Sequence, residues 1–164
     1  MNLRQIAVER FDVVTNKSFE RVLCELEKGI GPPDITRYFQ QKAAAQSMEE
    51  YAAVVNGAVG TADLMEFMRF DPGAVLRKDP ASKAFKMVRI IAGNPLIMKQ
   101  MAEHVPDAGS YAPVTILVSE RKDGIHLSYD LMSSYLAPYQ NAPALEVARA
   151  LDEKVIRLLE KAAN

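Results

Sequence analysis

The sequence predicts an α+β fold, in which a mainly antiparallel sheet of about five strands is covered by helices. Some segments alternate apolar and polar residues with a period of two, and others repeat apolar residues at helical spacing. An Asp-Gly pair between the last two strand-like segments indicates a tight antiparallel hairpin. In chain order the segments give β-α-α-β-β-α-β-β-α-α. With 164 residues, 49% of them hydrophobic, the chain fits a single domain, 1–164, with a sizeable core.

The first third of the chain predicts one strand and two helices. Residues 5–14, QIAVERFDVV, alternate as in a half-buried strand. Residues 18–29 repeat apolar residues at i, i+3, i+4 and i+7, between a serine suited to the N-cap and a glycine suited to the C-terminal end. Residues 34–56, which begin with a capping aspartate, predict a longer helix with Phe39 and Met48 on its inward stripe.

The rest of the chain predicts four strands and three helices. Residues 63–73, DLMEFMRFDPG, indicate a strand that ends in an Asp-Pro-Gly turn. Residues 84–93, AFKMVRIIAG, indicate the next strand, after which Asn94 and Pro95 suit the first positions of a helix. The Asp-Gly hairpin, a short helix and a long helix follow, over residues 114–131, 133–139 and 144–162.

Motifs between Phe67 and Tyr129 resemble those of a known family. One strand ends in aromatic-x-Arg-aromatic-Asp, the next ends in Gly-Asn-Pro, and the spacing from Asn94 to the final hairpin agrees without a gap. The pattern resembles the bacterial and archaeal family called domain of unknown function 302 (DUF302). The matching residues are Phe67, Arg69, Phe70, Asp71, Gly93, Asn94, Pro95, Met101, Pro106, Gly109, Pro113, Gly124, Ser128 and Tyr129.

The resemblance implies a small α+β domain that is commonly dimeric and has no agreed activity. Three features depart from the family pattern. Met98 stands where a glycine is usual, and Asp130-Leu131-Met132 replaces Asn-Asp-Pro. The predicted helix 34–56 looks like an insertion relative to the family.

Charge and composition disfavour several functions. The 20 Lys and Arg residues balance 21 Asp and Glu, without a block of like charges, so we expect no nucleic-acid partner. Charges at Arg4, Glu9 and Arg10 interrupt any secretory signal, and no apolar run is long enough for a membrane span. We therefore expect a cytoplasmic protein without a membrane partner, and the single cysteine agrees with a reducing compartment.

The Gly93-Asn94-Pro95 motif has two interpretations. It ends a strand and caps the next helix, which capping preferences favour. Alternatively, a helix N-terminus there offers N–H groups to an anionic ligand, although the glycines and lysine of a phosphate-binding loop are missing.

Charged residues within apolar strands predict a second candidate site. Arg69 and Arg89 lie in strands where a charge needs a partner, and alternation along the last hairpin offers polar groups near them. If these strands are neighbours, the groups form one polar cluster, in which an arginine holds an acid group and Tyr129 donates a hydrogen bond. The alternative is salt bridging inside the fold or at a dimer interface. The candidate ligand-binding residues are Arg69, Arg89, Asn94, Glu120, Tyr129 and Asp130.

Other reactive side chains predict less. Cys24 suits a small buried hydrophobic position, and a reactive thiol would need a cationic neighbour or a helix N-terminus. His104 and His126 lack ligands at metal-binding spacing, so we expect no metal site, and no cofactor is indicated. The eight methionines suit core filling, or alternatively an adaptable apolar pocket.

Three functional hypotheses follow. The leading one is a small-ligand-binding or regulatory homodimer without catalysis, whose ligand is a metabolite. The second is a redox or sulfur-handling protein that acts through Cys24. The third is a structural interaction module that uses helix 34–56.

Overall fold

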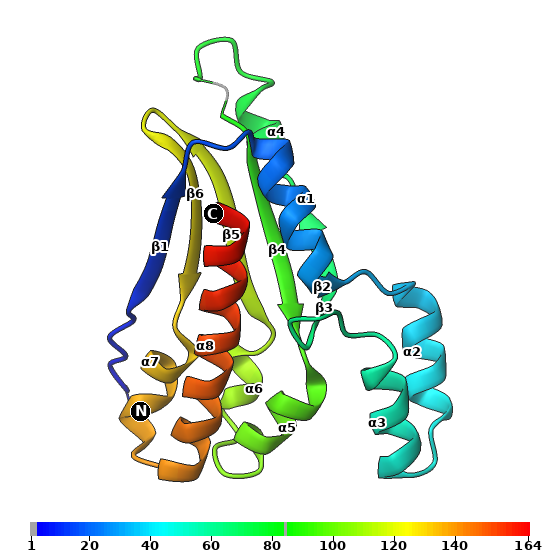
Figure 1. The fold of residues 1–164 in the computed structure, drawn as a ribbon. Coiled ribbons are helices and arrows are strands. Elements are labelled where there is room, and N and C mark those ends of the chain that lie inside the picture. Colours follow the sequence, from blue (N-terminus) through cyan, green and yellow to red (C-terminus); the bar gives the residue numbers. More distant parts are fainter. Residues whose placement is uncertain (1–2, 84) are drawn as a thin grey trace.

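The computed structural model describes residues 3–83 and 85–164, which form one six-stranded sheet and its helices (Figure 1). The order is β1-β6-β5-β4-β3-β2, and every neighbouring pair is antiparallel except β2 and β3, which are parallel. The strands are Arg10–Thr15 (β1), Ile30–Gly31 (β2), Leu64–Phe70 (β3), Met87–Gly93 (β4), Val114–Arg121 (β5) and Gly124–Asp130 (β6). The predicted α+β class is confirmed, and the short strand β2 adds to the five predicted strands.

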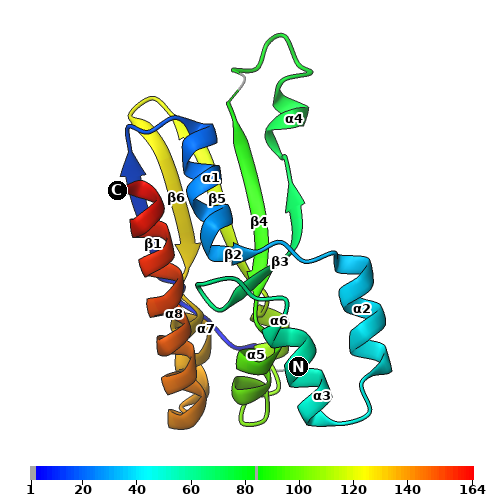
Figure 2. The same cartoon turned by 45° about the vertical axis from the view of Figure 1, so that its right-hand side comes forward.

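The long helices α1 and α8 cover one face of this sheet (Figures 1 and 2). Short helices and a 3₁₀ turn (η1) lie at the ends of the strands, and the pair α2–α3 projects from the edge near β2. The helices are Phe19–Gly29 (α1), Ile35–Ala44 (α2), Met48–Asn56 (α3), Gly73–Leu76 (α4), Pro95–Ala102 (α5), Ala108–Tyr111 (α6), Met132–Leu136 (α7), Ala137–Tyr139 (η1) and Ala142–Ala163 (α8).

The main core lies between the sheet and helices α1 and α8. Ile90, Ile116 and Leu127 alternate onto this face of three adjacent strands and belong to one buried cluster with Val22 of α1 and Leu159 of α8. Burial of each such side chain stabilises the fold by about 1.5–3 kcal/mol. Neither view shows a described helix across the middle of the opposite face (Figures 1 and 2), which we call the open face.

The single helix predicted over 34–56 is wrong, because the chain folds there into α2 and α3. Ala45 has extended backbone, and the Ser47 side chain accepts a hydrogen bond from the Glu50 N–H at 3.1 Å, which starts a new helix. The Glu50 carboxylate also accepts from the Gln46 N–H at 2.7 Å. Because the helix is broken, the predicted inward stripe is also wrong at Phe39 and Met48, which are each 51% exposed.

Strand β2, which was not predicted, depends on a close backbone contact. Gly31 lies so near the 58–60 loop that a Cβ there would collide with the Ala58 carbonyl oxygen. A Cβ on Gly60 would likewise collide with the Gly29 carbonyl. Only glycine at these two positions lets Ile30–Gly31 lie beside β3.

The ends of the other elements differ modestly from the prediction. β1 begins at Arg10 rather than at residue 5, and α8 begins at Ala142, where the Asn141 side chain accepts from the Ala144 N–H at 3.0 Å. β4 begins at Met87, and Ala84, the first residue of the predicted strand, lies outside the described residues.

Candidate functional site

A cavity of about 330 Å³ opens on the open face, where β5 and β6 meet α6 and α7. Its lining combines two arginines, an aspartate, hydroxyl groups and aromatic rings. The lining residues are Arg10, Arg89, Tyr111, Val114, Thr115, Leu117, Ser128, Tyr129, Asp130, Met132 and Tyr135.

Strand register brings the charged groups of this cavity together. Arg89 of β4 lies opposite Leu117 of β5, which in turn lies opposite Ser128 of β6. Asp130 of β6 lies opposite Arg10 of β1. These residues share the face that the core residues of the same strands do not use, so their side chains point away from α1 and α8.

The two arginines differ in their partners. Arg10 donates from Nε and Nη2 to both carboxylate oxygens of Asp130, at 2.6 and 2.9 Å. This hydrogen-bonded pair raises the pKa of Arg10 and lowers the pKa of Asp130. Arg89 instead donates only to the Thr115 hydroxyl, at 3.3 Å, and no carboxylate of the described residues lies within 4 Å of it. Arg89 therefore presents an uncompensated positive charge to the cavity.

Tyrosines form one wall of the cavity. The rings of Tyr111 and Tyr135 stack with their centroids 4.9 Å apart and their planes 16° from parallel. The hydroxyls of Tyr111 and Tyr139 lie 2.8 Å apart. Burial, and then the negative charge of Asp130, raise the pKa of Tyr135, so its hydroxyl stays protonated at neutral pH. The wall can stack on a flat ligand and also donate hydrogen bonds to it.

Tyr129 supports the site from the core side. Its hydroxyl donates to Asp152 of α8 at 2.7 Å, and burial followed by that carboxylate raises its pKa. Asp152 also accepts from the N–H groups of Met132 and Ser133, at 2.7 and 3.1 Å. The carboxylate thus binds the first turn of α7, the helix that carries Tyr135.

The predicted polar cluster is divided by strand alternation. Arg89 and Asp130 point into the open-face cavity, whereas Arg69 and Glu120 lie on the helix-covered side. Tyr129 borders the cavity, but its side chain points to the helix-covered side, so the prediction that its hydroxyl donates to a ligand is wrong. Arg69 forms ion pairs at 2.6 Å with Glu66 and with Glu27 of α1.

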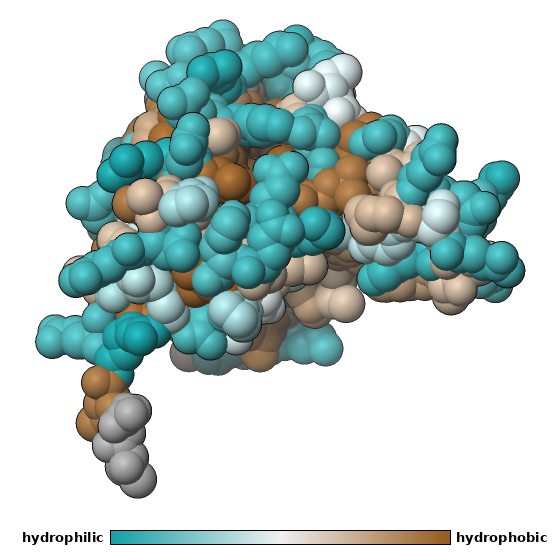
Figure 3. Space-filling view, turned by 90° about the horizontal axis from the view of Figure 1, so that it is seen from below, coloured by the Kyte–Doolittle hydropathy of each residue, from teal (hydrophilic) through white to brown (hydrophobic). Residues whose placement is uncertain are grey.

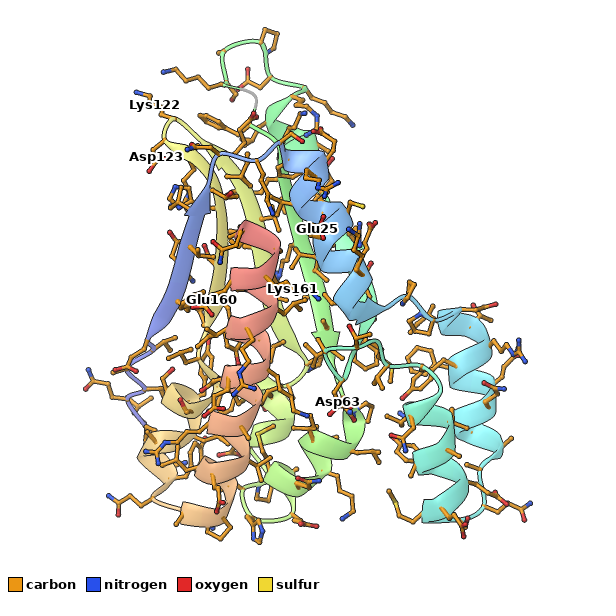
Figure 4. The ribbon with its side chains drawn as sticks, in the orientation of Figure 1. Glu25, Asp63, Lys122, Asp123, Glu160 and Lys161 are labelled. Carbon is orange, nitrogen blue, oxygen red and sulfur yellow. The ribbon has the colours of Figure 1, made fainter. Side chains whose placement is uncertain are left out.

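Glu120 and Asn94 make backbone contacts elsewhere. The Glu120 carboxylate accepts from the Lys86 N–H at 3.3 Å. The Asn94 side chain accepts from the Leu96 N–H at 2.9 Å, which is the predicted helix cap, and donates to the Asp63 carbonyl and carboxylate oxygens at 3.2 and 2.9 Å. Figure 4 shows Asp63 on the loop above α5.

A second polar group on the open face was not predicted. The His126 ring nitrogens lie 2.7 Å from an Asp12 oxygen and 3.0 Å from an Asp123 oxygen, and the Ser128 hydroxyl donates to Asp12 at 2.6 Å. Burial raises the pKa of Asp12, but its bonds to Ser128 and His126 outweigh that effect and lower it. Alternation had placed His126 and Ser128 on one face, but the pairing of β1 with β6, which supplies Asp12, has no local signal in the sequence.

Cys24 is exposed, so the prediction of a buried position is wrong. The buried side of α1 runs through Phe19, Val22 and Leu26, and Cys24 lies two residues from the last two, about 200° around the helix. Across residues 3–83 and 85–164, no group of three or more metal-ligating side chains is placed to hold an ion. The same residues include no helix with both the length and the apolar character needed to cross a membrane.

The fold and the cavity define a small α+β protein built on one mainly antiparallel sheet with an open face. Residues 39–162 match the family described as "Domain of unknown function DUF302", and the chain belongs to that family. The resemblance in the sequence is thereby confirmed.

A solved structure of the family has a similar fold. It is the crystal structure of an uncharacterized conserved protein DUF302 from Bacillus stearothermophilus, with a TM-score of 0.65 and 10% sequence identity. The similarity covers 93% of this chain and 97% of that chain, and at this identity it shows the fold alone. No curated protein matches the sequence.

Proposed function

We propose that this protein is a small-ligand-binding or regulatory homodimer, and that its ligand is a metabolite whose acid group binds Arg89. The observation that carries the proposal is the uncompensated charge of Arg89 on the wall of the open-face cavity. A guanidinium group offers a planar pair of donors that matches a carboxylate or a phosphate.

The size and walls of the cavity support a metabolite as the ligand. Its volume of about 330 Å³ falls at the lower end of the range for small-molecule sites. Stacked Tyr111 and Tyr135 would contact the body of the ligand, while the Arg10–Asp130 pair lies beside Tyr135 on the same cavity.

Exposed apolar residues support a homodimer through the open face. Met68 and Phe70 of β3 are 52% and 45% exposed, and Val14 of β1 is 44% exposed. Alternation places Phe70 beside Arg89, on the same face as the cavity. A second copy that covers this face would bury these side chains and enclose the ligand.

The proposal assigns binding rather than catalysis to the cavity. Ser128 is its one serine, and with 3% exposure and a hydroxyl bonded to Asp12 it is poorly placed to attack a substrate. We further propose that the protein acts in the cytoplasm, which its single cysteine favours.

A thermal-shift screen over carboxylic acids, sugar phosphates and nucleotides tests the proposal. A ligand at 100 times its Kd stabilises the native state by about 2.7 kcal/mol, which raises the Tm of a protein of this size by about 5–10 °C. Arg89→Gln should weaken binding of the hit about 10- to 100-fold, since it removes a charge-assisted contact.

Arg157→Gln is the matched control, because Arg157 is an exposed arginine of α8 whose one carboxylate partner among the described residues is Glu153. It should bind the hit as the wild type does. A library in which nothing raises the Tm, or a hit that Arg89→Gln binds with wild-type affinity, would overturn the proposal.

A second candidate function uses the α2–α3 hairpin as an interaction module. Phe39 and Met48 project from it, each half-exposed. In this alternative the α2–α3 hairpin binds a second copy of the chain. A variant that lacks residues 34–56 would then form a smaller oligomer than the wild type does. The redox alternative rests on Cys24 alone, since the chain has no second cysteine to resolve an oxidised thiol.

A further inference from the structure

A second cavity, of about 180 Å³, lies between the α2–α3 hairpin and the start of α5. Val114 borders both cavities, but Arg89 lines only the one on the open face and Lys42 lines only this one. Seen from below, the hairpin projects to the right of the main body, with apolar side chains around the hollow between them (Figure 3).

The walls of this cavity are mainly apolar. Phe67 of β3, Met98 and Met101 of α5, and Leu151 of α8 contribute large side chains. A dry apolar cavity of about 150 Å³ accommodates benzene, so this volume suits one aromatic ring or a short alkyl chain. The unbranched methionine side chains can adjust to either shape.

One positive charge lies on this apolar wall. Lys42 is half-buried, and its Nζ atom lies 5.7 and 5.9 Å from the ring centroids of Phe39 and Tyr51. Within the described residues, no carboxylate lies within 4 Å of this ammonium group. Its favourable contacts are therefore with aromatic faces, and its charge lacks an acidic partner.

We propose that this cavity binds a small apolar carboxylic acid. The ring or alkyl chain packs against Phe67, Met98 and Met101, and the carboxylate pairs with the Lys42 ammonium. One cation suits a monoanion, whereas a phosphate dianion would leave charge and acceptor oxygens unpaired beside apolar walls.

The Gly93-Asn94-Pro95 motif forms part of the rim of this cavity. Its asparagine amide is engaged by Asp63 and by the Leu96 N–H. The motif therefore shapes the cavity through its backbone and cap, and Lys42 supplies the charge that recognises the acid.

Benzoate and hexanoate are the probes for this site, with benzyl alcohol as the neutral comparison. In protein labelled with 13C at the methionine methyl groups, benzoate should shift the NMR signals of Met98 and Met101. The signals of Met68 and Met87, which lie on the open face, should not move. Lys42→Met should weaken benzoate binding about tenfold and leave benzyl alcohol binding unchanged.

Two matched variants separate this site from the open-face cavity. Lys122→Met removes a lysine at the β5–β6 turn (Figure 4), far from the α2–α3 hairpin, and should bind benzoate normally. Arg89→Gln should also bind benzoate normally, so this result stands apart from the test of the proposed function. Benzoate shifts at Met68 or Met87 without shifts at Met98 and Met101, loss of the Met98 and Met101 shifts in Arg89→Gln, or no binding at all would each overturn the proposal.

Discussion

Replacement of Asp152 by alanine should strongly destabilise the protein. Asp152 is 5% exposed and accepts three hydrogen bonds, from the Tyr129 hydroxyl and from the Met132 and Ser133 N–H groups. Alanine leaves the Tyr129 hydroxyl and the Ser133 N–H without an acceptor, while the Met132 N–H still contacts the Tyr129 hydroxyl oxygen at 3.2 Å. Since each unpaired buried donor costs about 1–3 kcal/mol, we expect a loss of about 4 kcal/mol, which lowers the Tm by about 8–16 °C.

Urea unfolding followed by circular dichroism measures this loss. Tyr129→Phe removes one of the three donors and should cost about 1 kcal/mol. Glu153→Ala is the matched control, because this neighbouring carboxylate is exposed and forms an ion pair with exposed Arg157, so the change should stay within about 0.5 kcal/mol. If Asp152→Ala costs no more than Glu153→Ala, then Asp152 does not hold α7 in place and our account of the cavity wall is wrong.

Three further predictions concern the open face, the Arg10–Asp130 ion pair and the α2–α3 hairpin. Phe70→Asp places a charge on the proposed dimer interface and should convert the dimer to a monomer, as measured by light scattering. Val75→Asp, on exposed α4, should leave the dimer intact, and a monomeric wild type would contradict the prediction. The pKa of Asp130 is lowered by Arg10, so its contribution to stability is complete above the ordinary pKa of an aspartate and is lost as the pH falls from about 5 towards 3. Arg10→Gln should reduce the change in the free energy of unfolding, measured with urea, over this pH range. An unchanged profile would show that the Arg10–Asp130 pair does not contribute to stability. Tyr38→Phe should raise the free energy of unfolding by about 1 kcal/mol, since among the described residues its buried hydroxyl has no partner; a lower urea midpoint would refute this.

Local signals in the sequence predicted the elements with strong caps and turns. The Ser18, Asp34 and Asn94 side chains each accept the capping hydrogen bond expected of them, at 3.2, 3.0 and 2.9 Å. The Asp123-Gly124 pair closes the predicted hairpin, with Gly124 at a φ of 139°. These features depend on residues a few positions apart, which is why one sequence suffices to predict them.

Features that depend on strand order were harder to predict from the sequence. Alternation separated the two faces of each strand, but it left open which faces of different strands coincide. Arg69 and Arg89 both lie within apolar strands, yet the register of β3 with β4 puts them on opposite sides of the sheet. Arg10 and Asp12 reach the open face only because β1 pairs with β6, more than 100 residues away in sequence.

The missed helix break has a local explanation. Ser47-x-x-Glu50 is a capping-box sequence, but the apolar spacing around it also fits one continuous helix. The capping box predicts a helix start at this position, whereas the apolar periodicity predicts a continuous helix. The chain follows the capping box, because extended backbone at Ala45 lets α3 turn back beside α2.

A crystal structure of the protein with the best hit from the acid screen would test the central claim most directly. We predict that the acid group of the ligand lies within hydrogen-bonding distance of the Arg89 guanidinium, with the body of the ligand against Tyr111 and Tyr135. Density for the ligand away from Arg89, with the open-face cavity unoccupied at saturating concentration, would contradict the account.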